Sequence, residues 1–135
     1  MSVKRIDHIG IAVESIEESL KLYKEVLGME FKGVEELTDR GLKTGFIQAG
    51  DAMIELLEPI SEKSTISKFI EKKGPGMHHI ALLVEDINQS MNTLKEKGYR
   101  LLSEEPEEGA HGTKVVFLHP KSTNGVLLEL VESDH

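Results

Sequence analysis

The stretch HIGIAVESIEESL, residues 8–20, decides the fold, because it recurs 71 residues later as HIALLVEDINQSM, residues 79–91. The two stretches align without a gap and share six of their thirteen residues, beginning with His8 and His79. Each half of the chain also ends in a similar apolar stretch that contains a glutamate, AMIELLEP at 52–59 and VLLELVES at 126–133. An internal repeat of this kind predicts one structural module that occurs twice.

Each repeat is predicted to begin with a strand that leads into a helix. The Ile- and Val-rich run at its start is short enough for a strand, and a helix start signal follows it. Ser15 with Glu18 is typical of a capping box, and Asp86 with Gln89 repeats the pattern. Apolar residues then recur at helical spacing, and a glycine is expected to end each helix, Gly28 in the first repeat and Gly98 in the second.

The remainder of each repeat is predicted to form three strands. They are FKGVEEL, LKTGFIQAG and AMIELLE in the first repeat, and YRLLSEE, TKVVFLH and GVLLELV in the second. The predicted fold is therefore α+β, a single domain over residues 1–135 with tandem βαβββ modules at about 3–59 and 77–133. A linker at about 60–76 separates the modules, and Ser64 is expected to cap a short helix within it.

Composition excludes several classes of function. The formal net charge of -8 argues against nucleic acid or an anionic membrane as the main partner. The absence of cysteine excludes disulfides, thiolate catalysis and thiolate metal sites. No run approaches the roughly 20 apolar residues of a membrane span, and the first residues lack the apolar stretch of a signal peptide, so a cytoplasmic location is expected.

Four polar residues of the repeated strands are expected to converge. Successive side chains of a strand point to opposite faces, so His8 and His79 lie opposite the branched apolar face that packs against the helix. Glu55 and Glu129 each interrupt an apolar strand, where a carboxylate is costly unless its desolvation is compensated. A lone histidine or glutamate of this kind is more often structural, but here an early His and a late Glu occur in both repeats.

Two modules related by a two-fold axis would bring His8, Glu55, His79 and Glu129 together as ligands of one divalent metal ion. Two imidazoles and two carboxylates suit Co²⁺, Mn²⁺, Fe²⁺, Ni²⁺ or Zn²⁺ better than Ca²⁺, and we expect Co²⁺ first. An octahedral ion would keep two positions open for substrate oxygens. We therefore predict that the mixed sheets of the two modules form a cup around a metal.

The other histidines are weaker candidates for a site. His78 leaves the opposite face of its strand from His79 and is expected to be structural. His111 and His119 stand beside predicted turns and could line a pocket. His135 ends the chain and is expected to be disordered.

These residues resemble the vicinal oxygen chelate superfamily, which contains glyoxalase I, extradiol dioxygenases, fosfomycin resistance proteins and methylmalonyl-CoA epimerases. The similarity covers nearly the whole chain and is greatest to the epimerases, in the start IDHIGIAV, the linker EKSTISKFIEKKGPGMHHIALLV and the ending GAHGTKVVFLHPKSTNGVLLEL. The resemblance implies that His8, His79 and Glu129 are metal ligands and that Glu55 takes the ligand position where some epimerases have Gln. It also implies a homodimer and an acyl-CoA substrate, methylmalonyl-CoA.

One position departs from the epimerase pattern. A proposed base of the epimerases is a glutamate in the third strand of the first module, and the aligned residue here is Thr44, a poor base at neutral pH. Inversion needs two acid/base groups on opposite faces of the enolate. The alternatives to Thr44 are Glu129, Glu55, Glu36 or a metal-bound water. Lys121 is a candidate partner for a phosphate of CoA.

Other activities are compatible with the same residues. A glyoxalase I-type lyase would use the same metal and an ene-diolate, and a non-catalytic binding protein would keep the fold without the chemistry. Binding proteins of this superfamily commonly lose the metal ligands, whereas extradiol dioxygenases use two histidines and one carboxylate. Four ligands therefore count against the binding protein and the dioxygenase, and the resemblance to the epimerases leaves the lyase as the alternative enzyme.

Overall fold

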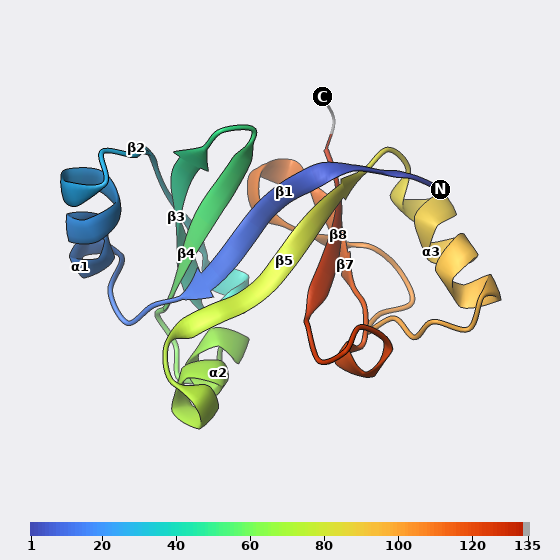
Figure 1. Cartoon of the computed structure of the whole chain (residues 1–135). Helices are drawn as coiled ribbons and strands as arrows, with labels where there is room; N and C mark the ends of the chain where they lie inside the picture. The colour runs from blue at the N-terminus through green and yellow to red at the C-terminus, as the bar shows by residue number, and fades with distance from the viewer. Residues whose placement is uncertain (134–135) are drawn as a thin grey trace. The chain divides into compact units, whose positions relative to one another are not determined.

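The computed structural model describes residues 1–133, and its strands and helices are shown in Figure 1. The elements are β1 (Val3–Ala12), α1 (Ile16–Leu20), the π-helix η1 (Lys21–Val26), β2 (Glu30–Leu37), the 3-10 turn η2 (Thr38–Arg40), β3 (Leu42–Ala49), β4 (Ala52–Pro59), α2 (Thr65–Lys73), β5 (Gly76–Val84), α3 (Ile87–Glu96), β6 (Glu107–Glu108), the 3-10 turn η3 (Ala110–Gly112), β7 (Lys114–Phe117), the 3-10 turn η4 (Pro120–Ser122) and β8 (Leu128–Glu132). His135, for which disorder is expected, lies outside the described residues. The described chain divides into two compact units, residues 8–78 and residues 1–7 with 79–133.

The unit of residues 8–78 contains a mixed sheet with the strand order β2-β3-β4-β1. β1 runs parallel to β4, and β3 is antiparallel to both of its neighbours. Ile16 of α1 packs on one face of this sheet, against Ile47 and Leu56, and Ile66 of α2 packs on Ala12 and Leu57 at the end of the other face. The strand pattern predicted from the sequence is therefore present, with the branched residues of β1 toward α1.

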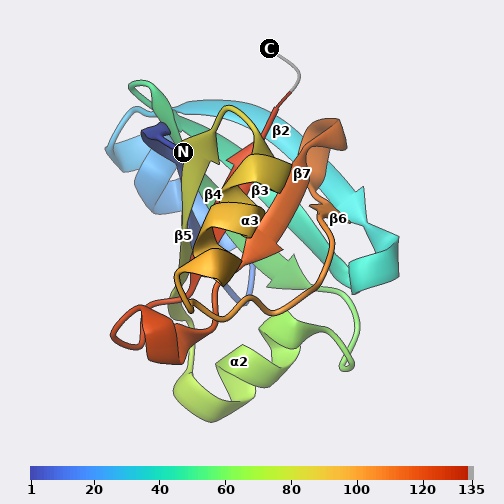
Figure 2. The ribbon, with the colours of Figure 1, turned by 90° about the vertical axis from the view of Figure 1, so that its right-hand side faces the viewer.

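The unit of residues 1–7 and 79–133 repeats this arrangement with the strand order β5-β8-β7-β6. β5 runs parallel to β8, and β7 is antiparallel to β8 and β6. Figure 2 shows α3 lying across one face of the sheet, where Ile87 and Met91 pack against Val84, Val116 and Leu130. The predicted α+β fold with two βαβββ modules is confirmed.

Both module helices begin at the predicted caps. The Ser15 hydroxyl accepts a hydrogen bond from the Glu18 N–H at 3.1 Å, and the Asp86 carboxylate accepts one from the Gln89 N–H at 3.0 Å. In the linker, Ser64 caps α2 in the same way, as predicted. No helix within residues 1–133 is long and apolar enough to cross a membrane.

The structure differs from the sequence prediction in two elements. The first helix changes at Lys21 to π-helical geometry, in which the Leu27 N–H donates to the Leu22 carbonyl at 2.8 Å. The predicted strand at residues 99–105 is reduced to an isolated bridge between Leu101 and Leu118, and the two-residue strand β6 lies beyond it. Pro106 stands between the two paired pieces, and it has no N–H to donate to a neighbouring strand.

Candidate functional site

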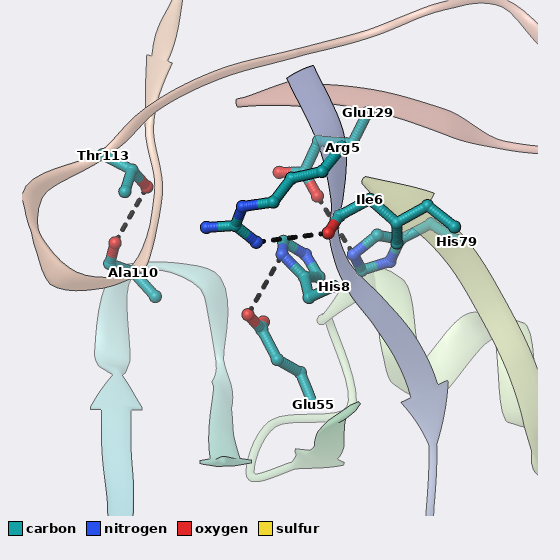
Figure 3. A network of polar contacts seen from close by, with 8 residues as sticks. All are labelled: Arg5, Ile6, His8, Glu55, His79, Ala110, Thr113 and Glu129. Atoms are coloured by element: carbon teal, nitrogen blue, oxygen red, sulfur yellow. Dashed lines mark hydrogen bonds and ion pairs between the residues drawn. The ribbon is translucent and has the colours of Figure 1, made fainter. Parts of the chain in front are cut away.

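The unit of residues 8–78 carries an imidazole–carboxylate pair in which the imidazole is buried and the carboxylate is partly buried. His8 lies on β1 and Glu55 on the neighbouring strand β4, where Gly10 is the register partner of Glu55. The His8 Nδ1 is 3.1 Å from a carboxylate oxygen of Glu55, and the side chains are only 7% and 13% exposed (Figure 3). Both side chains leave the sheet on the face opposite α1, as the alternation of β1 predicts.

The other unit carries the equivalent pair. The His79 Nε2 is 3.0 Å from a carboxylate oxygen of Glu129, and these side chains are 7% and 6% exposed (Figure 3). His79 lies on β5 and Glu129 on β8, where Ala81 is the register partner of Glu129. The His79 ring also meets the Phe117 ring edge-on, with the ring centroids 5.8 Å apart, which restricts the orientation of the imidazole.

An aromatic residue borders each carboxylate. Phe46 is the cross-strand partner of Glu55 on β3, and Phe117 is the cross-strand partner of Glu129 on β7. Neither phenylalanine was predicted as a site residue, although the two are separated by the same 71 residues as the two histidines. The repeat offset is thus the signal that could have found them. Their rings place apolar surface beside both carboxylates.

Within each pair, the distance between the imidazole nitrogen and the carboxylate oxygen is suitable for two ligands of the same metal ion. Neighbouring ligands about 2.1 Å from an octahedral ion lie about 3 Å apart, which is also the length of a direct hydrogen bond. Buried carboxylates are costly unless a cation or hydrogen bonds compensate the lost hydration. One imidazole and one carboxylate in each unit, with no thiolate in the chain, are a donor set that fits divalent transition metals.

The structure places the proposed base positions on two different faces of one sheet. Thr44 is 1% exposed and is the cross-strand partner of Leu57, so it shares the face of Glu55. Glu36 is exposed and is the cross-strand partner of Lys43, on the opposite face. The structure therefore does not bring Glu36 to the face that carries His8 and Glu55.

The remaining predicted residues lie outside these pairs. The His78 ring packs edge-on against Phe69 of α2 at 5.1 Å, as expected for a structural residue. The His119 Nδ1 accepts a hydrogen bond from the Lys121 N–H and so caps η4, on which Lys121 is exposed. His111 is exposed in η3 and has a left-handed backbone conformation with a φ of 58°.

Known proteins match nearly the whole chain. The model of the Glyoxalase/Bleomycin resistance protein/Dioxygenase superfamily matches residues 7–117. The chain is 44% identical to the ethylmalonyl-CoA/methylmalonyl-CoA epimerase of Cereibacter sphaeroides, over 95% of this chain and 97% of the relative. Two solved structures also match it. The methylmalonyl-CoA epimerase of Mycobacterium tuberculosis has a TM-score of 0.93 and 35% identity, over 98% of this chain and 90% of that chain.

The second solved structure is a methylmalonyl-CoA epimerase in complex with methylmalonyl-CoA and NH4+. It has a TM-score of 0.91 and 36% identity, over 98% of this chain and 96% of that chain. Identities of this size over nearly complete chains show a shared family as well as a shared fold. The chain belongs to the glyoxalase/bleomycin resistance protein/dioxygenase superfamily and, within it, to the family of the methylmalonyl-CoA epimerases.

Proposed function

We propose that this protein is a divalent-metal-dependent epimerase that interconverts the (R) and (S) forms of methylmalonyl-CoA through an enolate. The observation that carries the proposal is the His–Glu pair in each repeat, with both imidazoles buried, in a chain that is 44% identical to an epimerase of this substrate class. A lyase of the glyoxalase I type is the alternative, because it would use the same donor set.

The proposal assigns His8, Glu55, His79 and Glu129 to one ion, with Co²⁺ as the first candidate and Mn²⁺, Ni²⁺, Fe²⁺ or Zn²⁺ as alternatives. When bound, such an ion stabilises negative charge on the thioester oxygen of an enolate. Phe46 and Phe117 are the cross-strand partners of the two carboxylates and place apolar surface beside them. A cytoplasmic location and a homodimer belong to the same proposal.

Side chains of the protein itself are proposed to transfer the protons. The α-proton of methylmalonyl-CoA is acidified by a thioester and a carboxylate, and inversion requires its removal from one face and its return to the other. The buried Glu129 and the partly buried Glu55 are the carboxylates proposed to do this work. The exposed Lys121 is proposed to pair with a phosphate of CoA, where an ammonium group supplies a point charge.

Metal stoichiometry tests whether the two pairs share an ion. We expect about one ion per chain by elemental analysis, and loss of that ion in both His8→Ala and His79→Ala. If each pair bound its own ion, the wild type would hold two ions and each variant would keep one.

Proton exchange tests the reaction. The enzyme is incubated in deuterated water with methylmalonyl-CoA and, separately, with the adduct of methylglyoxal and glutathione. Exchange and inversion of the CoA ester alone support the epimerase. Turnover of the thiol adduct alone would identify the lyase, and binding of the ester without exchange would identify a binding protein.

A further inference from the structure

A row of three side chains crosses the sheet of residues 8–78 on the face that carries Glu55. Glu35 on β2 is the cross-strand partner of Thr44 on β3, and Thr44 is the partner of Leu57 on β4. Residues directly opposite each other in an antiparallel pair share a face, with their Cβ atoms about 5 Å apart. Leu57 and Glu55 are two residues apart on one strand and therefore share that face as well.

A β-bulge in β2 puts Glu35, rather than Glu36, on this face. Phe31 is the partner of Ile47 and packs in the core under α1, whereas Gly33 is the partner of Phe46 on the opposite face. The extra residue between them reverses the phase of the strand. Simple alternation from Phe31 would turn Glu35 toward α1, but the observed register turns it to the face of Glu55.

The two adjacent glutamates consequently have different surroundings. Glu36 is exposed and opposite Lys43, whose ammonium group lies 3.6 Å from Glu58. Glu58 in turn accepts a hydrogen bond from the Ile16 N–H at the start of α1, so this is the helix side of the sheet. Glu35 is partly buried and stands beside the fully buried Thr44.

The spacing on the Glu55 face suits a small acyl group. Two strand spacings of about 4.8 Å and two residues of about 3.3 Å place the Glu35 and Glu55 backbones roughly 12 Å apart. Both side chains extend from the same face, so a carbon held near Glu55 lies within reach of the Glu35 carboxylate. Thr44, the residue between them in the row, carries a hydroxyl that is a poor base.

We propose that Glu35 is the catalytic acid/base supplied by the first repeat; this assignment rests on the proposed function. The Glu35 carboxylate removes the α-proton of one stereoisomer, the C–H electron pair moves into the thioester as an enolate, and the proton stays on Glu35. Protonation of the opposite face by a second acid, for which Glu129 is the candidate, gives the inverted product. In the reverse direction protonated Glu35 returns its proton to its own face.

The test follows each stereoisomer of methylmalonyl-CoA separately in deuterated water, with metal-loaded wild type and Glu35→Gln. General acid–base groups contribute roughly 10²–10⁴-fold, so interconversion is expected to fall at least about 100-fold in the variant. Only the isomer whose α-proton faces Glu35 loses exchange. The other isomer still exchanges without inversion, because its own base is intact. Metal content is unchanged.

Two further variants accompany this experiment. Glu36→Gln removes the same charge from the neighbouring residue on the other face, and it is expected to keep both exchange rates near those of the wild type. Glu35→Asp retains a carboxylate on a shorter side chain and is expected to keep part of the activity that Glu35→Gln loses.

Each outcome decides the assignment. Interconversion by Glu35→Gln at the wild-type rate would overturn it, and so would an equal loss of exchange for both isomers, which indicates a structural role. A wild type that exchanges neither isomer would refute the proposed function and the role of Glu35 with it. Loss of exchange for one isomer alone supports the assignment.

Discussion

Glu129 combines deep burial with a negative charge. It is 5% exposed between Leu128 and Leu130, and its carboxylate contacts the imidazole of His79. The effective penalty for burying an ion in a protein is several kcal/mol unless hydrogen bonds or a nearby cation compensate the lost hydration. A divalent cation would compensate such a carboxylate, which is why this residue supports a metal site.

We expect Glu129→Gln to bind metal more weakly and to lose α-proton exchange even when it is saturated with metal. The amide keeps the shape and one oxygen ligand but cannot accept a proton near neutral pH. Exchange is measured at saturating metal, with metal content checked in the same sample. A metal-replete variant that turns over normally would leave Glu129 a ligand role only.

The adjacent histidines of β5 provide a matched pair of substitutions. His79→Ala is expected to abolish tight metal binding and activity, because it removes an imidazole that contacts Glu129. His78→Ala should leave both nearly intact, because His78 leaves the opposite face of β5 from His79 and its ring packs edge-on against Phe69. Metal content and exchange rate are compared for the two variants. Equal losses would contradict the roles assigned to the two strand faces.

At the scale of elements, the strand that carries each candidate carboxylate ligand is joined by a hydrogen bond to the helix of its own module. Glu58 lies three residues after Glu55 and accepts from the Ile16 N–H at 2.7 Å. Glu132 lies three residues after Glu129 and accepts from the Ile87 N–H at 2.8 Å. A carboxylate at a helix N-terminus also interacts favourably with the helix dipole. The end of the ligand strand is therefore held in register in both repeats.

The bulge in β2 is expected to matter for activity as well as stability. Gly33 has a φ of 113°, and an added Cβ would meet nothing within 4 Å, so Gly33→Ala introduces backbone strain without a clash. Strain of this kind costs roughly 1–3 kcal/mol, measurable by urea unfolding. Because the bulge sets the face of Glu35, epimerisation should fall more than the loss of folded protein explains.

Gly50→Ala is the control for this prediction. Gly50 lies in the turn between β3 and β4, has a φ of 64° and also has open space around it. The substitution should destabilise the protein to a similar degree but leave the rate per folded molecule unchanged. Equal rates in the two variants would contradict a catalytic consequence of the bulge.

At the scale of the whole molecule, each repeat contributes one imidazole, one carboxylate and one phenylalanine beside it. Removing a bound ion would leave the buried Glu129 and the partly buried Glu55 without its compensation. We therefore expect a chelator to lower the melting temperature, in line with the stabilisation RT ln(1 + [L]/Kd) that a ligand gives the folded state. His8→Ala, which is expected to lack tight metal binding, should show little response. An equal response in both proteins would contradict metal-linked stability.

A homodimer is the remaining prediction at this scale. β2 is the last strand in the sheet of residues 8–78, and β6 is the last strand in the sheet of the other unit. Strand edges of this kind can pair with a second chain. Sedimentation at micromolar concentration is expected to show a dimer, and a stable monomer would contradict the prediction.

The sequence alone determined the repeat, the order of the elements and the face on which His8, Glu55, His79 and Glu129 lie. These features depend on local periodicity and on helix caps such as Ser15 and Asp86, which involve residues only a few positions apart in the sequence. The tertiary structure decided the phase of β2, and with it the choice of Glu35 over Glu36. It also reduced the predicted strand at 99–105 to an isolated bridge. The face of an edge strand depends on its register with the neighbouring strand, and a bulge that one residue creates reverses that face. No local pattern in the sequence records that pairing.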